Sequence, residues 1–211
     1  IYALIVIFVC SLIVIRANRL FKLSEHSGIR YFRNAFFFYG LGFAFRYLLD
    51  LPLVRLGLHE EVGFLTDILF EFFLVMGGFF LLYSLIWTKL ENPKTRSSLL
   101  NGRISLFYEM SIIVVLLDFL WVGFNFMFLT QTALFFVLSI LSYSNYKRNG
   151  SKRKFPKFYF IAMLLGLFAW ILNTLASFYF SWNQAIMVNI YVFNLIFFFL
   201  FLYGVIKVTR V

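Results

Sequence analysis

The sequence predicts an all-α integral membrane protein with seven transmembrane helices in one domain that spans residues 1–211. Three observations predict this class: the chain is 63% hydrophobic, it is 13% charged, and most of its basic residues lie between apolar stretches. Soluble domains are roughly 45–50% apolar and about 25% charged. A soluble fold of this length could not bury so much apolar surface, whereas lipid tolerates it.

The first three predicted spans follow from apolar runs and their boundaries. The run 1–15 ends at Arg16 and Arg19, which makes it short for a helix that needs about 20 residues to cross a bilayer. A cleaved signal peptide is the alternative, but the run has no basic leading region and no Ala-x-Ala-like end. The second span covers 34–51, ending before a proline, and the third covers 64–87.

The second half of the chain contains two long apolar stretches. Residues 104–146 and 158–206 contain no lysine or arginine. As one helix, the first stretch would be about 65 Å long, which is about twice the thickness of the hydrocarbon core. Turns near 123–125 and 181–184 therefore divide the two stretches into spans four and five, and six and seven.

The distribution of charge supports seven spans and sets their orientation. With seven spans, all 19 lysines and arginines except Arg46 and Arg55 lie on one side, in the connectors 16–33, 89–103 and 147–157 and at the C-terminus. The positive-inside rule makes this side cytoplasmic and the N-terminus external, in a multi-pass protein of the plasma or inner membrane type. Short basic loops without a groove-reading motif exclude nucleic acid as a partner. The connector Lys147–Lys157 suits anionic lipid head groups, or serves only as a topology signal.

Two pairs of segments indicate an internal repeat. Residues 41–49 (LGFAFRYLL) resemble 165–173 (LGLFAWILN), and 82–86 (LYSLI) resemble 202–206 (LYGVI). Each pair lies in spans of the same orientation. We therefore expect parallel three-helix repeats, 1–88 and 126–208, around a linking helix over 104–123, which is a theme among transporters.

This three-plus-one-plus-three arrangement resembles the transporter–opsin–receptor group, which includes the SWEET and PQ-loop transporters and the microbial rhodopsins. The resemblance is one of topology over the whole chain. The sequence contains no Pro-Gln pair, and Asn194 stands where an opsin carries its retinal lysine. The resemblance therefore implies a helical transporter or receptor and no retinal, and it transfers no site residues.

Charged residues within the predicted spans indicate a site. Arg46 and Asp50 in span two, and Asp67 and Glu71 in span three, are each spaced i, i+4 and share a helix face. An ionisable residue within a membrane helix costs about 2.5–3.5 kcal/mol on the insertion scale, which favours a functional role. We expect Arg46 to pair with one or two of these acids. Asp118, near the centre of span four, is predicted to respond to protons or cations.

Spans five to seven add polar and small side chains. Span six carries a stripe of small residues that ends in Asn173, and span seven places Tyr191 and Asn194 on one face. Thr132 and Ser139 in span five indicate hydrogen bonds between helices. The predicted site is an outward-facing cavity for a small solute or ion, and its predicted residues are Arg46, Asp50, Asp67, Glu71, Asp118, Asn173 and Asn194. The alternative interpretation is a structural ion-pair network that binds nothing.

These observations favour a transporter or ion pathway. A receptor or sensor that signals to a cytoplasmic partner is the alternative, and a subunit of an oligomer or larger membrane complex is a third interpretation. We expect no enzymatic activity and no cofactor, because the sequence contains no His-Glu-x-x-His, Gly-x-Ser-x-Gly or Walker pattern. We expect no metal site, since His26 and His59 are predicted on opposite sides of the membrane.

Overall fold

The computed structural model describes residues 2–49, 59–90, 102–121, 125–148, 154–179 and 184–209, and these residues form seven α-helices and one π-helical segment. An all-α fold is therefore confirmed for the described part of the chain. The elements are α1 (Tyr2–Ser24), α2 (Ser27–Ala44), the π-helical segment η1 (Phe45–Leu49), α4 (His59–Leu90), α5 (Gly102–Leu120), α6 (Phe126–Arg148), α7 (Lys154–Tyr179) and α8 (Gln184–Thr209).

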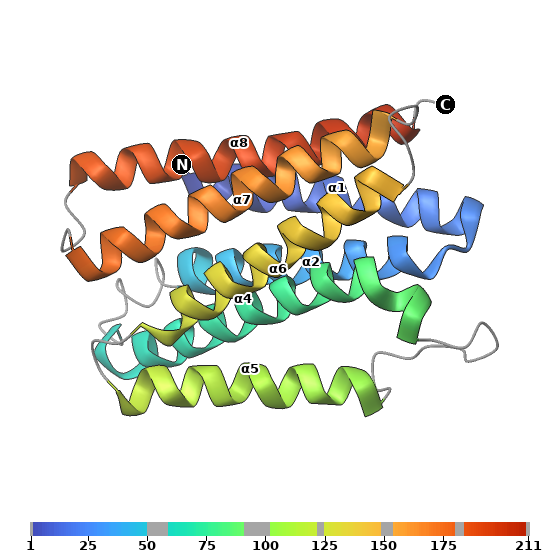
Figure 1. Ribbon diagram of the computed structural model, residues 1–211. Coiled ribbons are helices and arrows are strands. Elements are labelled where there is room, and N and C mark those ends of the chain that lie inside the picture. Colours follow the sequence, from blue (N-terminus) through green and yellow to red (C-terminus); the bar gives the residue numbers. More distant parts are fainter. Residues whose placement is uncertain are drawn as a thin grey trace.

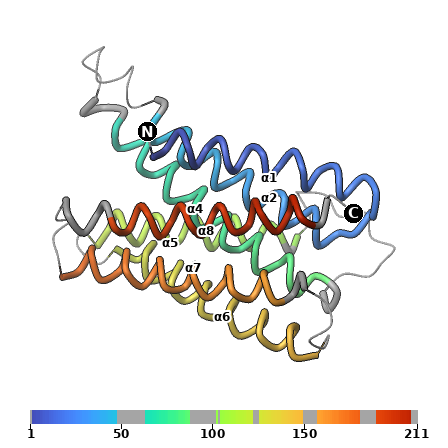
Figure 2. Tube along the Cα trace, turned by 90° about the horizontal axis from the view of Figure 1, so that it is seen from above, coloured from blue at the N-terminus to red at the C-terminus, as the bar shows by residue number. Residues whose placement is uncertain are grey.

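Six of the helices form a closed ring. Each of α1, α2, α4, α6, α7 and α8 packs on the next, and α8 returns to pack on α1. Helix α5 lies outside this ring, against α4 and α6 (Figures 1 and 2). The ring consists of two consecutive groups of three, α1–α2–α4 and α6–α7–α8, with the linking helix to one side. The sequence repeat itself stays a prediction.

The predicted basic connector 16–33 is largely helical, which corrects the expected boundaries. Helix α1 continues to Ser24, α2 begins at Ser27, and only two residues separate them. Glu25 ends α1 because it adopts φ 51°, a left-handed conformation, and its N–H donates to the Phe21 carbonyl at 2.8 Å. The arginines of this stretch therefore lie on the ends of two helices and not in a loop.

Apolar surface identifies the chain as a polytopic membrane protein that contacts the lipid bilayer. Among the described residues, five helices (α1, α4, α6, α7 and α8) are long and apolar enough to cross a membrane. Large apolar side chains such as Leu4, Phe8 and Phe168 are exposed on the outside of the bundle. Within the described residues, helices α2 and α5 do not meet this criterion of length and apolar composition. Two arginines lie in the first turns of α2, and α5 carries Arg103, Glu109 and Asp118.

Aromatic side chains fill the inside of the ring toward the end where α8 finishes. Phe36 and Phe201 have ring centroids 5.0 Å apart, and Tyr159 lies 5.7 Å from Phe201. Phe198 continues the layer, 6.2 Å from Phe36. Phe36, Phe198 and Phe201 are all buried. These four side chains, Phe36, Tyr159, Phe198 and Phe201, form an aromatic layer across this part of the ring.

Hydrogen bonds between helices hold the second group together. Thr132 and Thr174 have hydroxyl oxygens 2.8 Å apart, and the Ser139 hydroxyl donates to the Met163 carbonyl at 3.2 Å. Both contacts join α6 to α7, so the predicted interhelical role of Thr132 and Ser139 is confirmed. The small stripe on α7 is buried as well, which allows close approach of neighbouring helices.

Candidate functional site: a cavity inside the helical ring

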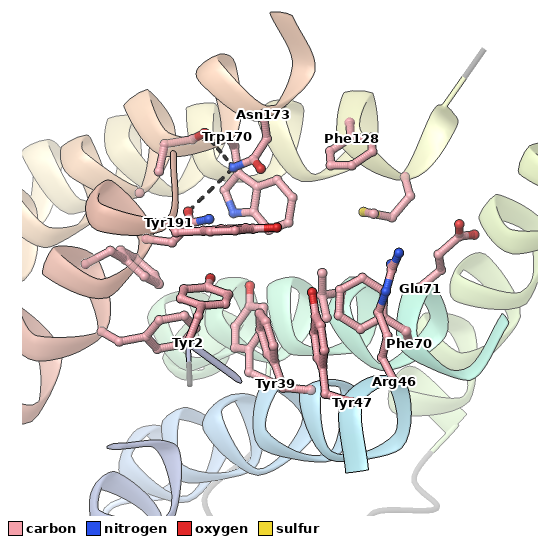
Figure 3. Close-up of a pocket in the computed structure, with 18 of the residues that line it drawn as sticks. Tyr2, Tyr39, Arg46, Tyr47, Phe70, Glu71, Phe128, Trp170, Asn173 and Tyr191 are labelled. Atoms are coloured by element: carbon pink, nitrogen blue, oxygen red, sulfur yellow. Dashed lines mark hydrogen bonds between the residues drawn. The ribbon is translucent and has the colours of Figure 1, made fainter. Parts of the chain in front are cut away.

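A cavity of about 400 Å³ lies inside the ring, at the end where α1 and α8 begin. This volume is in the range of small-molecule pockets. Every helix of the ring contributes to its wall, and among the described residues α5 contributes none (Figure 3). Its lining residues are Tyr2, Tyr39, Phe43, Arg46, Tyr47, Asp67, Phe70, Glu71, Leu74, Asn125, Met127, Phe128, Gly166, Ala169, Trp170, Asn173, Tyr191, Asn194, Phe197 and Phe198.

Arg46 and Asp67 lie at the mouth of the cavity. The Arg46 Nε atom is 3.7 Å from the Asp67 Oδ1 atom, and the two side chains are 42% and 59% exposed. A pair this long and this exposed contributes at most about 1 kcal/mol to stability. The Arg46 guanidinium also lies 4.5 Å from the Phe70 ring centroid, a cation–π contact. Pairing of Arg46 with one of the expected acids is therefore confirmed, and among the described residues the second contact of the guanidinium is an aromatic ring.

Glu71 lines the cavity and lies near two further acids, Asp67 and Asp118, and near Arg46. Among the described residues, the ion pair of Arg46 is the one with Asp67. Glu71 therefore places a carboxyl group at the cavity wall beside this ion pair.

Asp118 has a structural role that the sequence analysis missed. Helix α5 ends at Leu120, so Asp118 lies in its last turn and not near the centre of a span. Its two carboxylate oxygens accept hydrogen bonds from the first amides of α6, Oδ1 from Phe126 N and Oδ2 from Met127 N at 2.9 Å. These N–H groups have no partner within their own helix, so Asp118 caps α6. The prediction of Asp118 as a central, cavity-lining group is wrong in its position.

Two asparagines and a tyrosine form a polar strip on the opposite wall. The Asn173 Nδ2 atom donates to the Ala169 carbonyl at 2.8 Å and reaches the Asn194 Oδ1 atom at 3.5 Å. The Tyr2 side chain lies near Asn194, and the Tyr2 ring stacks on Tyr191 with centroids 4.4 Å apart. Both asparagines line the cavity, and the hydrogen bond between them joins α7 to α8.

None of the tyrosines of the cavity was predicted as a site residue. Figure 3 shows the Tyr2, Tyr39 and Tyr47 hydroxyls on one side of the space, opposite Trp170 and Asn173. Tyr47 lines the cavity beside its neighbour Arg46 because both lie in η1. The wider turn of a π-helix changes which residues share a face, and such segments are frequent at functional sites. A helix-period search of the sequence could not have found this pair.

The structure brings together five of the seven predicted residues: Arg46, Asp67, Glu71, Asn173 and Asn194 all line the cavity. Asp118 lies behind Glu71, and Asp50 lies outside the described residues. Binding by any of them stays a prediction. Within the described part of the chain, no group of three or more His, Cys, Asp or Glu side chains could hold a metal ion.

We expect Asp118→Ala to destabilise the protein by about 0.5–2 kcal/mol, the usual loss of a helix cap. Asp118→Asn should lose less, because an amide oxygen still accepts one of the two bonds. The measurement is thermal unfolding together with hydrogen exchange at the Phe126 and Met127 amides, which should exchange faster only in the alanine variant. Glu109→Ala, an exposed acid on the same helix, is the control. Equal effects of Asp118→Ala and Glu109→Ala would contradict the capping role.

Comparison with known proteins shows that the chain is similar to an archaeal protein. An uncharacterized protein of Archaeoglobus fulgidus is 29% identical over 189 residues, which cover 85% of this chain and 78% of the relative. No protein family matches the chain, and no solved structure matches it significantly.

Proposed function

We propose that all seven helices cross the membrane, with the N-terminus outside and the basic end of the bundle in the cytoplasm. The helices alternate in direction, so the start of α2 meets the end of α4: the His26 and Trp87 rings lie 4.9 Å apart. Likewise the start of α7 meets the end of α8, where Phe158 and Tyr203 lie 5.7 Å apart. This end carries the basic residues of α1, α2, α6 and α7, and the positive-inside rule makes it cytoplasmic.

On this orientation the cavity opens to the outside, and the chain is a membrane transporter of a small solute. The observation that carries the proposal is the position of the cavity between two consecutive three-helix groups. Tyr39 and Glu71 come from the first group, and Asn173 and Asn194 from the second. Sites between structural repeats suit alternating access, since a movement of one group against the other exposes the same residues to each side in turn.

A receptor or sensor is the second candidate, and the aromatic layer favours it. Phe36, Phe198 and Phe201 close the cavity toward the cytoplasmic end. Unbroken, tightly packed helices of this kind suit a pocket whose occupancy is reported by small shifts of helices. In this case ligand binds from outside and does not cross.

The experiment is uptake and binding in the same proteoliposomes. The full chain is reconstituted, and sets of cationic, neutral and anionic solutes are measured for accumulation and for binding, with empty liposomes as the blank. Uptake supports the transporter, and saturable binding without uptake supports the receptor. If no solute of any class binds or crosses, both proposals fail.

A matched pair of variants links any signal to the cavity. Trp170 lines the cavity, whereas Trp121 is an exposed residue just after α5. We expect Trp170→Leu to weaken uptake or binding by about tenfold or more, since a lost aromatic contact in a pocket costs roughly 1–3 kcal/mol. Trp121→Leu should leave both unchanged. Equal loss in the two variants would contradict a binding role for the cavity.

A further inference from the structure

We propose that the ligand of the cavity is a small organic cation, such as an amine or a quaternary ammonium. This inference rests on the proposed function, because it names the chemical class of the solute that the cavity binds.

The described wall carries more acid than base. Asp67 and Glu71 line the cavity, and Arg46 is the basic residue that accompanies them. Asp118 adds a third carboxyl group near Glu71. Arg46 forms its ion pair with Asp67, so the described wall has one carboxyl group, that of Glu71, in excess of its basic groups. This excess of acid favours a cationic ligand over an anionic one.

The aromatic side chains of the wall suit a cation. An ammonium group over the face of a tyrosine or tryptophan is attracted by the ring quadrupole, and this attraction strengthens when water is excluded. Arg46 shows this chemistry inside the protein, since its guanidinium lies over Phe70 while it faces Asp67. A ligand cation near Trp170 and Glu71 would meet the same combination of ring and carboxylate.

The Tyr39 hydroxyl is the buried polar group that points to a ligand. Tyr39 is 2% exposed, and its hydroxyl has no hydrogen-bond partner among the described residues. Figure 3 shows this hydroxyl directed into the cavity. An unpaired buried hydroxyl is costly. A ligand that carries an N–H or O–H group would pair with it.

The test compares molecules of one shape and different charge. Choline and its neutral carbon isostere 3,3-dimethylbutan-1-ol share a hydroxyl and a trimethyl head, and 3,3-dimethylbutanoate supplies an anion. Binding to the detergent-solubilised full chain is measured by equilibrium dialysis. We expect choline to bind about 10–100-fold more tightly than the neutral isostere, the usual effect of a charged hydrogen-bonded or aromatic-caged group, and the anion to bind most weakly.

Variants connect this preference to named groups. We expect Glu71→Gln to reduce the preference of choline over the isostere about tenfold. Tyr39→Phe should weaken both molecules about equally, because both carry the hydroxyl. Glu109→Gln, an exposed acid on α5, should change neither.

Two outcomes overturn the inference and leave the proposed function intact: equal binding of choline and the isostere, or tighter binding of the anion. If Glu71→Gln misfolds, its thermal midpoint of unfolding will be lower. In that case the preference for choline over the isostere, measured on the unmodified chain and on Tyr39→Phe, decides whether the cavity selects a cation. If no solute from the cationic, neutral and anionic sets binds, the proposed function itself fails.

Discussion

Phe198→Ala is expected to lower the thermal midpoint of unfolding by about 6–20 °C. Phe198 is the buried residue of the aromatic layer that also lines the cavity, with ring centroids 6.0 Å from Tyr39 and 5.2 Å from Phe197. Truncation of a buried phenylalanine costs about 3–5 kcal/mol in proteins, and for a chain of this size each kcal/mol corresponds to about 2–4 °C. The void left by the missing phenyl group would join the cavity and thin the wall of the cavity toward the cytoplasm.

The adjacent residue supplies the control. Phe199 lies on the outside of the same helix and is 48% exposed, so Phe199→Ala should shift the midpoint by about 2 °C or less. Unfolding is followed in detergent by circular dichroism, and leakage of small solutes is compared in liposomes. Equal shifts of the thermal midpoint for the two variants would show that the Phe198 side chain does not fill the inside of the helical ring.

Gly166→Ala is expected to destabilise the protein, against the usual preference of helices for alanine. A Cβ atom at Gly166 would lie 2.5 Å from Phe135 Cε1 and 2.6 Å from Phe197 Cε2. Both rings are buried and belong to the neighbouring helices α6 and α8, so accommodation requires movement of the helices. Overpacking of this kind costs about 1–3 kcal/mol.

Gly204 provides the control for Gly166 within the same protein. It lies on α8, and a Cβ atom there would meet nothing within 4 Å. Gly204→Ala should therefore stabilise the protein by up to about 1 kcal/mol through helix propensity. The two variants are expected to shift the thermal midpoint in opposite directions. A rise for Gly166→Ala would mean that α7 is not in close contact with both neighbours.

The sequence predicted the membrane class and the course of the helices because both follow from local pattern. An apolar run of membrane length, and the basic residues at its ends, can be recognised within the sequence of a single span. The boundaries between α1 and α2 were missed because the helix end depends on the left-handed conformation of one residue, Glu25. Nothing in its residue type indicates that conformation, since glycine and asparagine are the usual residues there.

The candidate site was predicted in part. Intramembrane charges and amides stand out in an apolar sequence, and five of the seven predicted residues line one cavity. Tyrosines do not stand out in a chain with 32 phenylalanines and 12 tyrosines, so Tyr2 and Tyr39 were not assigned to the site. Asp118 was misplaced because its role depends on the turn that brings the amide of Met127 back to it, which is a tertiary contact.

The ring is sealed where the first and last helices meet, at the stacked rings of Tyr2 and Tyr191. Helix α8 leaves the ribosome after the other five helices of the ring, so α1 has one flank uncovered in the bilayer until α8 has been inserted. The wall of the cavity is complete only after this insertion, and a chain that stops before α8 has no pocket in which a solute could be enclosed.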